Sequence, residues 1–117
     1  MLRRMPKRTS AQLDSVFRAL GDPTRRAVIE QLATGSKSTS ALAQPFSMAF
    51  PSFTQHLDVL ERCGLVLSHK QGRIRTFRLA PGSMTHAESW ISTQRDLWDR
   101  RLDQLDNHLR TMKDMQP

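Results

Sequence analysis

The chain has 117 residues, a length that suits one domain able to bury a hydrophobic core without disulfides or metals. Its 18 lysine and arginine residues against 11 acids give a formal net charge of +7, which favours a polyanionic partner such as nucleic acid. The single cysteine excludes an intramolecular disulfide, and no apolar run approaches the roughly 18 residues of a membrane span, so we expect a cytoplasmic protein without membrane contact.

The first nine residues hold four basic residues and no acid, and we expect residues 1–9 to be a flexible basic arm that is either solvated or in contact with DNA. Ser10 is suited to cap a first helix. The apolar face of that helix is expected to comprise Leu13, Phe17 and Leu20. Asp22 and Pro23 predict the start of a second helix, with a capping carboxylate and a proline at the first helical position. Its predicted buried side comprises Ala27, Val28, Ile29 and Leu32.

A short helix at about 39–44 is expected to be cut short by Pro45, because proline inside a helix costs about 3 kcal/mol. Another helix is expected to have Pro51 in its first turn and to end at Gly64. Its predicted buried line comprises Phe53, Leu57 and Leu60. The remaining positions carry small hydrogen-bonding groups instead of the charged residues usual on solvated helices. They are Ser52, Thr54, Gln55, His56 and Asp58.

After Gly64 the pattern changes to two short strands, 65–67 and 74–79, joined by a turn at 70–73 in which Gly72 can adopt a positive φ. The turn and its flanks are strongly cationic, because residues 61–78 hold five basic residues against one acid. The cationic side chains of this hairpin, with one histidine, are His69, Lys70, Arg73, Arg75 and Arg78.

Residues 84–117 predict one long helix whose apolar residues recur at nearly heptad spacing. These residues are Ile91, Trp98, Leu102, Leu105, Leu109 and Met112. The charges of this segment are nearly balanced. Because an amphipathic helix must bury its apolar stripe, we expect a dimerisation helix, with packing wholly on its own domain as the alternative.

This order of elements predicts a mostly α (α+β) fold, a winged helix-turn-helix domain at residues 10–83 with a two-stranded β-wing, followed by a dimerisation helix at 84–117. The polar-faced helix fits the major groove of DNA, where the Gln55 amide can pair bidentately with adenine. Ser52 and Thr54 can contact bases or phosphates. The cations of the hairpin suit phosphates or a narrow minor groove.

Residues 13–79 resemble the ArsR/SmtB family of bacterial winged-helix transcriptional repressors. The stretches that carry the resemblance are FRALGDPTRRAVIEQL (17–32), PSFTQHLDVLERCGLV (51–66) and GRIRTFRLAPG (72–82). The sequence departs from the family pattern at Pro45, at Ala49 in place of a polar cap, and at Phe50.

The resemblance implies a homodimer joined through its last helices, usually together with its first, which places two recognition helices about one DNA turn apart on an inverted repeat. Carried over by position, the groove residues are Ser52, Thr54, Gln55 and His56. The wing residues are Lys70, Arg73 and Arg75.

Metal-sensing members of the family carry paired cysteines before the recognition helix, whereas residues 40–44 contain no thiol here. Other members bind zinc on the last helix, but His86 and His108 lie 22 residues apart, which is roughly 33 Å along a helix. We therefore predict no metal and no cofactor, with a site pairing these histidines across two chains as the alternative. Cys63 is expected to pack as a small hydrophobic residue, with an exposed thiol sensor as the alternative.

No nucleophile–base pair and no phosphate-binding glycine loop is evident, so the sequence predicts no enzymatic activity. We expect a sequence-specific DNA-binding regulator, a homodimeric repressor that binds double-stranded DNA at an inverted-repeat operator. The alternative is a winged-helix module for protein–protein interaction that binds DNA only non-specifically. The sequence does not identify an effector or show whether one exists.

Overall fold

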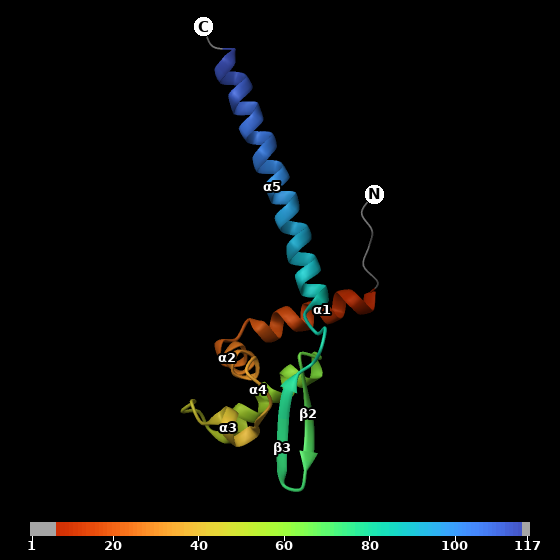
Figure 1. The fold of residues 1–117 in the computed structure, drawn as a ribbon, viewed down its shortest axis with the longest axis vertical. Coiled ribbons are helices and arrows are strands. Elements are labelled where there is room, and N and C mark those ends of the chain that lie inside the picture. The colour runs from red at the N-terminus through yellow and green to blue at the C-terminus, as the bar shows by residue number, and fades with distance from the viewer. Residues whose placement is uncertain (1–6, 116–117) are drawn as a thin grey trace. The chain divides into compact units, whose positions relative to one another are not determined.

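The computed structural model describes residues 7–115, and the side chains of residues 10–115. The helices are α1 (Lys7–Leu20), α2 (Pro23–Leu32), α3 (Thr39–Ala43), α4 (Phe50–Arg62) and α5 (Thr85–Asp114). The strands are β1 (Lys37–Ser38), β2 (Val66–Gln71) and β3 (Ile74–Leu79). This order confirms the predicted mostly α fold with a β-wing and a long C-terminal helix (Figure 1). The contacts divide the chain into residues 1–86 and 87–117, which are described separately.

Helix α1 begins at Lys7, so Ser10 lies inside the helix and does not cap it. Most of the predicted basic arm at 1–9 lies outside the described residues. The fully buried side chains of α1 are Leu13, Val16 and Ala19. Phe17 and Leu20 are only partly buried, so the helix is rotated from the predicted face toward the line of smaller residues.

Helix α2 begins as the sequence predicts, with Asp22 as its N-cap and Pro23 in the first turn. An Asp22 carboxylate oxygen accepts a hydrogen bond from the backbone N–H of Arg25 at 3.0 Å. Burial tends to raise the pKa of the Asp22 carboxyl, but this hydrogen bond and the adjacent His56 and Arg25 side chains hold that pKa below its ordinary value. On the other side of the helix, Val28 and Leu32 are buried in the core, while the predicted Ala27 and Ile29 are only partly covered.

The turn between α3 and α4 contains Pro45 and is held by an aromatic contact. Helix α3 ends at Ala43, two residues before Pro45, and is therefore as short as the sequence predicts. The ring of Phe46 packs on that of Phe53, with 5.2 Å between centroids. This contact closes the turn onto the buried side of α4.

Helix α4 faces the core with Phe53, Leu57 and Leu60, which are almost completely buried, as the periodicity predicts. Ala49 is its N-cap and supplies no side-chain hydrogen bond. At the other end Cys63 is 8% exposed and its thiol donates to the carbonyl of Leu60 at 3.3 Å. Burial raises the pKa of the Cys63 thiol, against weaker opposing effects of backbone hydrogen bonds and of Arg25. The structure therefore favours the packing role of this cysteine.

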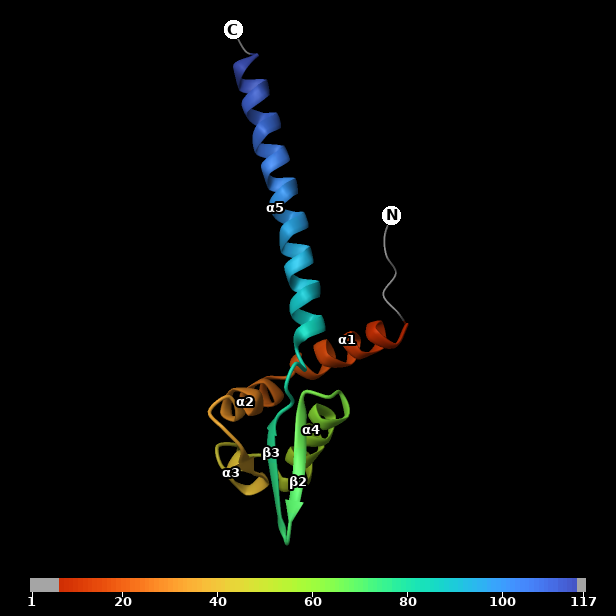
Figure 2. The ribbon, with the colours of Figure 1, turned by 45° about the vertical axis from the view of Figure 1, so that its right-hand side comes forward.

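Strands β2 and β3 form the antiparallel wing, and their register pairs Gln71 with Ile74. The loop is therefore only Gly72 and Arg73, and Gly72 has a φ of 63°, the arrangement of a type II′ turn. Strand β2 continues through Lys70 and Gln71, which the sequence had placed in the turn. Figure 2 shows this hairpin extending beyond the helices of residues 7–86.

The sheet has a third strand that the sequence did not predict. Lys37 of β1 pairs with Phe77 of β3, giving the strand order β1-β3-β2. The connection between α2 and α3 therefore includes a sheet contact. Ser38 then caps α3, because its hydroxyl accepts from the N–H of Ala41 at 3.2 Å.

Helix α5 spans 30 residues, and its predicted apolar stripe is exposed in the single chain. The exposed fractions run from 45% at Ile91 to 64% at Trp98. The other members of the stripe are Leu102, Leu105, Leu109 and Met112. Within residues 7–115, none of the helices has the length and apolar character that crossing a membrane requires.

Replacing the cap residue tests how much the start of α2 contributes to stability. Asp22→Ala is expected to lower the free energy of unfolding by about 1 kcal/mol, since it removes the side-chain acceptor. Asp22→Asn keeps an acceptor oxygen and serves as the control, with a smaller loss at neutral pH. The pKa of Asp22 is lowered in the folded state, so its charge stabilises the fold above the ordinary carboxyl pKa. That stabilisation is lost as the pH falls through the lowered pKa. Urea unfolding followed by circular dichroism in neutral and acidic buffer measures this, and equal stabilities of all three proteins would contradict it.

The burial of Cys63 leads to a prediction about the reactivity of its thiol. Cys63 in the native protein is expected to react with a maleimide far more slowly than in guanidinium, because burial blocks access and its raised pKa leaves little thiolate. Mass spectrometry of timed samples gives both rates. Similar rates in the two conditions would instead support an exposed thiol sensor.

Candidate nucleic-acid interface

The side of α4 that faces away from the core carries uncharged polar groups. Ser52 and Gln55 are exposed, and neither side chain has a hydrogen-bond partner among the described residues. Thr54 is half-buried on the flank of the helix, and its hydroxyl donates to the carbonyl of Pro51 at 2.9 Å. The amide of Gln55 is thus left available to an outside partner.

The fourth predicted groove residue, His56, lies on the opposite flank of α4, against the start of α2. Its ring atom Nδ1 is 3.2 Å from a guanidinium nitrogen of Arg25 and 3.7 Å from a carboxylate oxygen of Asp22. The structure therefore places Ser52 and Gln55 outward, Thr54 toward the wing and His56 toward α2. The four do not form one face.

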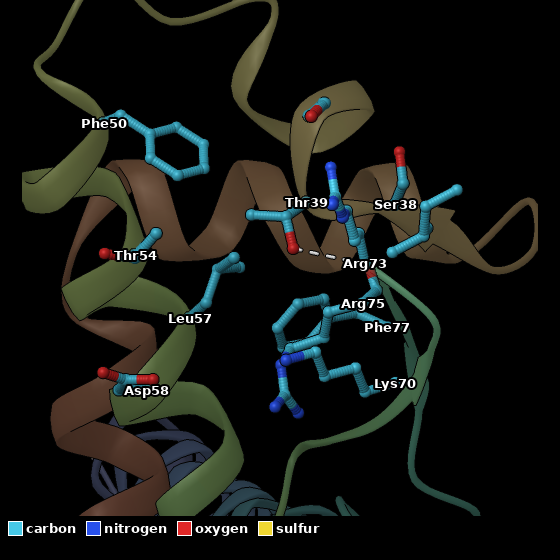
Figure 3. Close-up of a pocket in the computed structure, with 12 residues that line it drawn as sticks. Ser38, Thr39, Phe50, Thr54, Leu57, Asp58, Lys70, Arg73, Arg75 and Phe77 are labelled. Atoms are coloured by element: carbon cyan, nitrogen blue, oxygen red, sulfur yellow. Dashed lines mark hydrogen bonds between the residues drawn. The ribbon is translucent and has the colours of Figure 1, made fainter.

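A groove of about 610 Å³ lies between α4 and the wing (Figure 3). Phe50, Thr54, Leu57 and Asp58 contribute from α4, and the start of α3 contributes three hydroxyl residues. The predicted wing residues all lie on the other side of this groove. They are Lys70, Arg73 and Arg75. The groove thus brings the wing cations next to the polar-faced helix.

The Arg75 side chain is held by hydrogen bonds that connect the wing to α4. Its guanidinium donates to the Ser68 hydroxyl at 2.7 Å, and that hydroxyl donates to the carboxylate of Glu61 at the end of α4. The Arg75 carbonyl also accepts from the hydroxyl of Thr39 at 3.3 Å (Figure 3). Ser68 is not among the residues that the sequence pattern singles out. Period-two alternation from buried Val66 does place it on the side of β2 that carries the partly covered residues.

The cations of the wing are not neutralised by carboxylates. Among residues 10–115, the carboxylates within 4.0 Å of a basic side chain are Asp22, beside His56, and Asp106, beside Arg110, and neither contact involves the wing. Asp58 is the acid that lines the groove. The described residues contain no cluster of three or more side chains suited to a metal ion. The surface presents unpaired positive charge beside uncharged hydrogen-bonding groups, which is the combination that suits a nucleic-acid duplex.

Proteins similar in sequence to this chain agree with a nucleic-acid interface at this surface. A helix-turn-helix domain family model matches residues 20–69. The chain is 27% identical to the transcriptional repressor SdpR of Bacillus subtilis over 79 residues, which are 68% of this chain and 88% of that protein.

Solved structures give a closer match. The crystal structure of an ArsR family transcriptional regulator, RHA00566, has a TM-score of 0.74 and 42% sequence identity, covering 85% of this chain and 97% of that chain. A homodimeric winged helix-turn-helix DNA-binding domain from Mycobacterium bovis, Mb0332, shares the fold with a TM-score of 0.60 at 23% identity, over 82% of this chain and 94% of that one.

The relatives are transcriptional regulators, which confirms the prediction that the chain is not an enzyme. The 42% sequence identity to a solved ArsR family regulator extends over nearly the whole of that chain, and the two folds match. The polar face of α4 and the cationic wing agree with this match. The chain belongs to the ArsR family of winged helix-turn-helix transcriptional regulators.

Proposed function

We propose that the protein is a homodimeric repressor that binds an inverted-repeat operator, with residues 10–83 as the DNA-binding domain and 84–117 as the dimerisation segment. The observation that carries the proposal is the exposed, unpartnered polar face of α4 beside the unneutralised cations of the wing. The repressor activity of SdpR supports the direction of regulation.

Base reading in this proposal falls mainly to Gln55. An exposed Gln amide on a helix in the major groove matches the N6 donor and N7 acceptor of adenine. Ser52, three residues earlier on the same side of the helix, contacts a neighbouring base or phosphate. Thr54 lies nearer the groove toward the wing and is assigned a phosphate.

The wing supplies phosphate contacts. Lys70 and Arg73 are exposed at the hairpin tip, and Arg75 lies behind them with its guanidinium hydrogen-bonded to Ser68. Such contacts fix the register of the protein on the duplex and contribute most of the salt dependence.

The homodimer rests on the stripe of α5. Six large apolar side chains lie on one face of this helix. In the single chain five of them are more than half exposed, and the sixth, Ile91, is 45% exposed. A second copy of the same helix covers such a stripe by knobs-into-holes packing. The Mycobacterium bovis domain Mb0332, which shares the fold, is homodimeric, and this supports the same arrangement here.

Binding titrations at several salt concentrations test the proposal, using the DNA upstream of the gene and a scrambled duplex. A repressor is expected to prefer the specific duplex by roughly a thousandfold. Equal affinity for both duplexes, with only the salt dependence left, would favour the protein-interaction module instead.

Truncating the base reader is expected to separate specific from non-specific binding. Gln55→Ala should cost about 1–3 kcal/mol on the specific duplex and little on the scrambled one, because only base contacts carry sequence information. Lys70→Ala is the matched control, since it should weaken both duplexes alike and reduce the salt slope by about one. Fluorescence anisotropy measures all three proteins, and an equal loss of Gln55→Ala on both duplexes would argue against base reading.

Substitutions in the apolar stripe of α5 test the proposed dimerisation. Trp98→Ala is expected to raise the dimer dissociation constant at least tenfold, since buried aromatic anchors commonly contribute about 2 kcal/mol or more to an interface. Asp103→Ala, on the polar side of the same helix, should leave the constant unchanged. Sedimentation equilibrium gives the constants, and a dimer unaffected by Trp98→Ala would remove that residue from the interface.

A further inference from the structure

We propose that Arg25 and His56 form a bridge that sets the orientation of α4, so that both act as positioning residues for base reading. The inference rests on the proposed function, since it concerns how Gln55 and Ser52 are aimed. It assigns His56 a role within the protein in place of the DNA contact that the sequence predicts.

Arg25 is anchored firmly at the junction of α1 and α2. Its Nε donates to the carbonyl of Ala19 at 2.7 Å, and a terminal nitrogen donates to the carbonyl of Arg18 at 3.1 Å. Both carbonyls lie in the last turn of α1, where helix carbonyls lack partners within the helix. Hydrogen bonds from a charged donor are stronger than neutral ones, so the guanidinium is fixed relative to the end of α1.

The third nitrogen of the same guanidinium reaches α4. It lies 3.2 Å from Nδ1 of His56, in a partly buried position. Arginine can only donate, so Nδ1 of His56 is the acceptor in this contact. The Asp22 carboxylate lies 3.7 Å from the same Nδ1 and holds the backbone of Arg25 in place. One side chain therefore joins the end of α1, the start of α2 and the middle of α4.

The bridge gives the first half of α4 a directional contact with another helix, which the other residues of that half do not provide. Ala49 gives the helix no side-chain cap, and the core residues Phe53 and Leu57 determine which side of α4 is buried through apolar contacts that are not directional. The other polar link, from Glu61 to Ser68, lies at the far end of the helix. His56 directly follows Gln55, so a turn of α4 about its axis moves the Gln55 amide away from its base.

The matched control is the next residue. Arg26 has the same charge and also donates to a carbonyl of α1, that of Leu20 at 2.7 Å, but it has no hydrogen bond to α4. Arg25→Gln and Arg26→Gln thus remove the same charge from adjacent positions. Only the first removes the bridge.

The experiment measures affinity for the tightest duplex that the wild-type protein selects from a random library, and for a scrambled duplex, across a salt series. Arg25→Gln is expected to reduce the preference for the selected duplex about tenfold, the equivalent of one lost base contact, with an unchanged salt slope. Arg26→Gln should keep the preference. A salt slope that falls by about one in Arg25→Gln would make Arg25 a phosphate contact and overturn the bridge.

Two variants of the partner complete the test. His56→Asn keeps an acceptor near the position of Nδ1 and is expected to retain the preference within about threefold, whereas His56→Leu should lose about tenfold. Circular dichroism verifies that each variant is folded. Equal losses in both variants, or a preference kept in folded Arg25→Gln, would overturn the inference alone. A wild-type protein that selects no sequence would refute the proposed base reading itself.

Discussion

The buried line of α4 is the constraint on which the rest of the structure depends. Phe53, Leu57 and Leu60 are almost completely buried in α4, the helix that contacts α1, α2, α3 and β2. Their burial places Ser52 and Gln55 on the outward side of α4. The hydrophobic effect therefore decides which side chains are presented to solvent, while polar contacts refine the angle.

The wing is linked to the same helix from the opposite end. Strand β2 follows α4 after a short connection, and the Glu61–Ser68–Arg75 hydrogen bonds join the last turn of the helix to both wing strands. The groove between the two is thus bounded by elements that are mechanically coupled at one end. These hydrogen bonds hold Arg75 of the wing near the C-terminal end of α4.

The sequence predicts the elements that have strong local signals. Periodicity identified the buried line of α4, and Asp22-Pro23 identified the start of α2. It could not predict β1, since two residues are too few for a pattern, or the face of α1, where small and large apolar residues compete for the same contact. Within the site, exposure and charge could be predicted locally. The partner of His56 could not, because Arg25 lies 31 residues away and only the folded core brings them together.

The tight hairpin at the wing tip has a consequence for association with a duplex. A loop of only Gly72 and Arg73, closed by the Gln71–Ile74 pair, leaves few backbone torsions free. Ordering a flexible residue costs about 1–2 kcal/mol of conformational entropy, and here most of that cost is already met during folding. The cations at the tip thus arrive preorganised, and an inserted glycine–serine segment would weaken attachment without deleting a single positive charge.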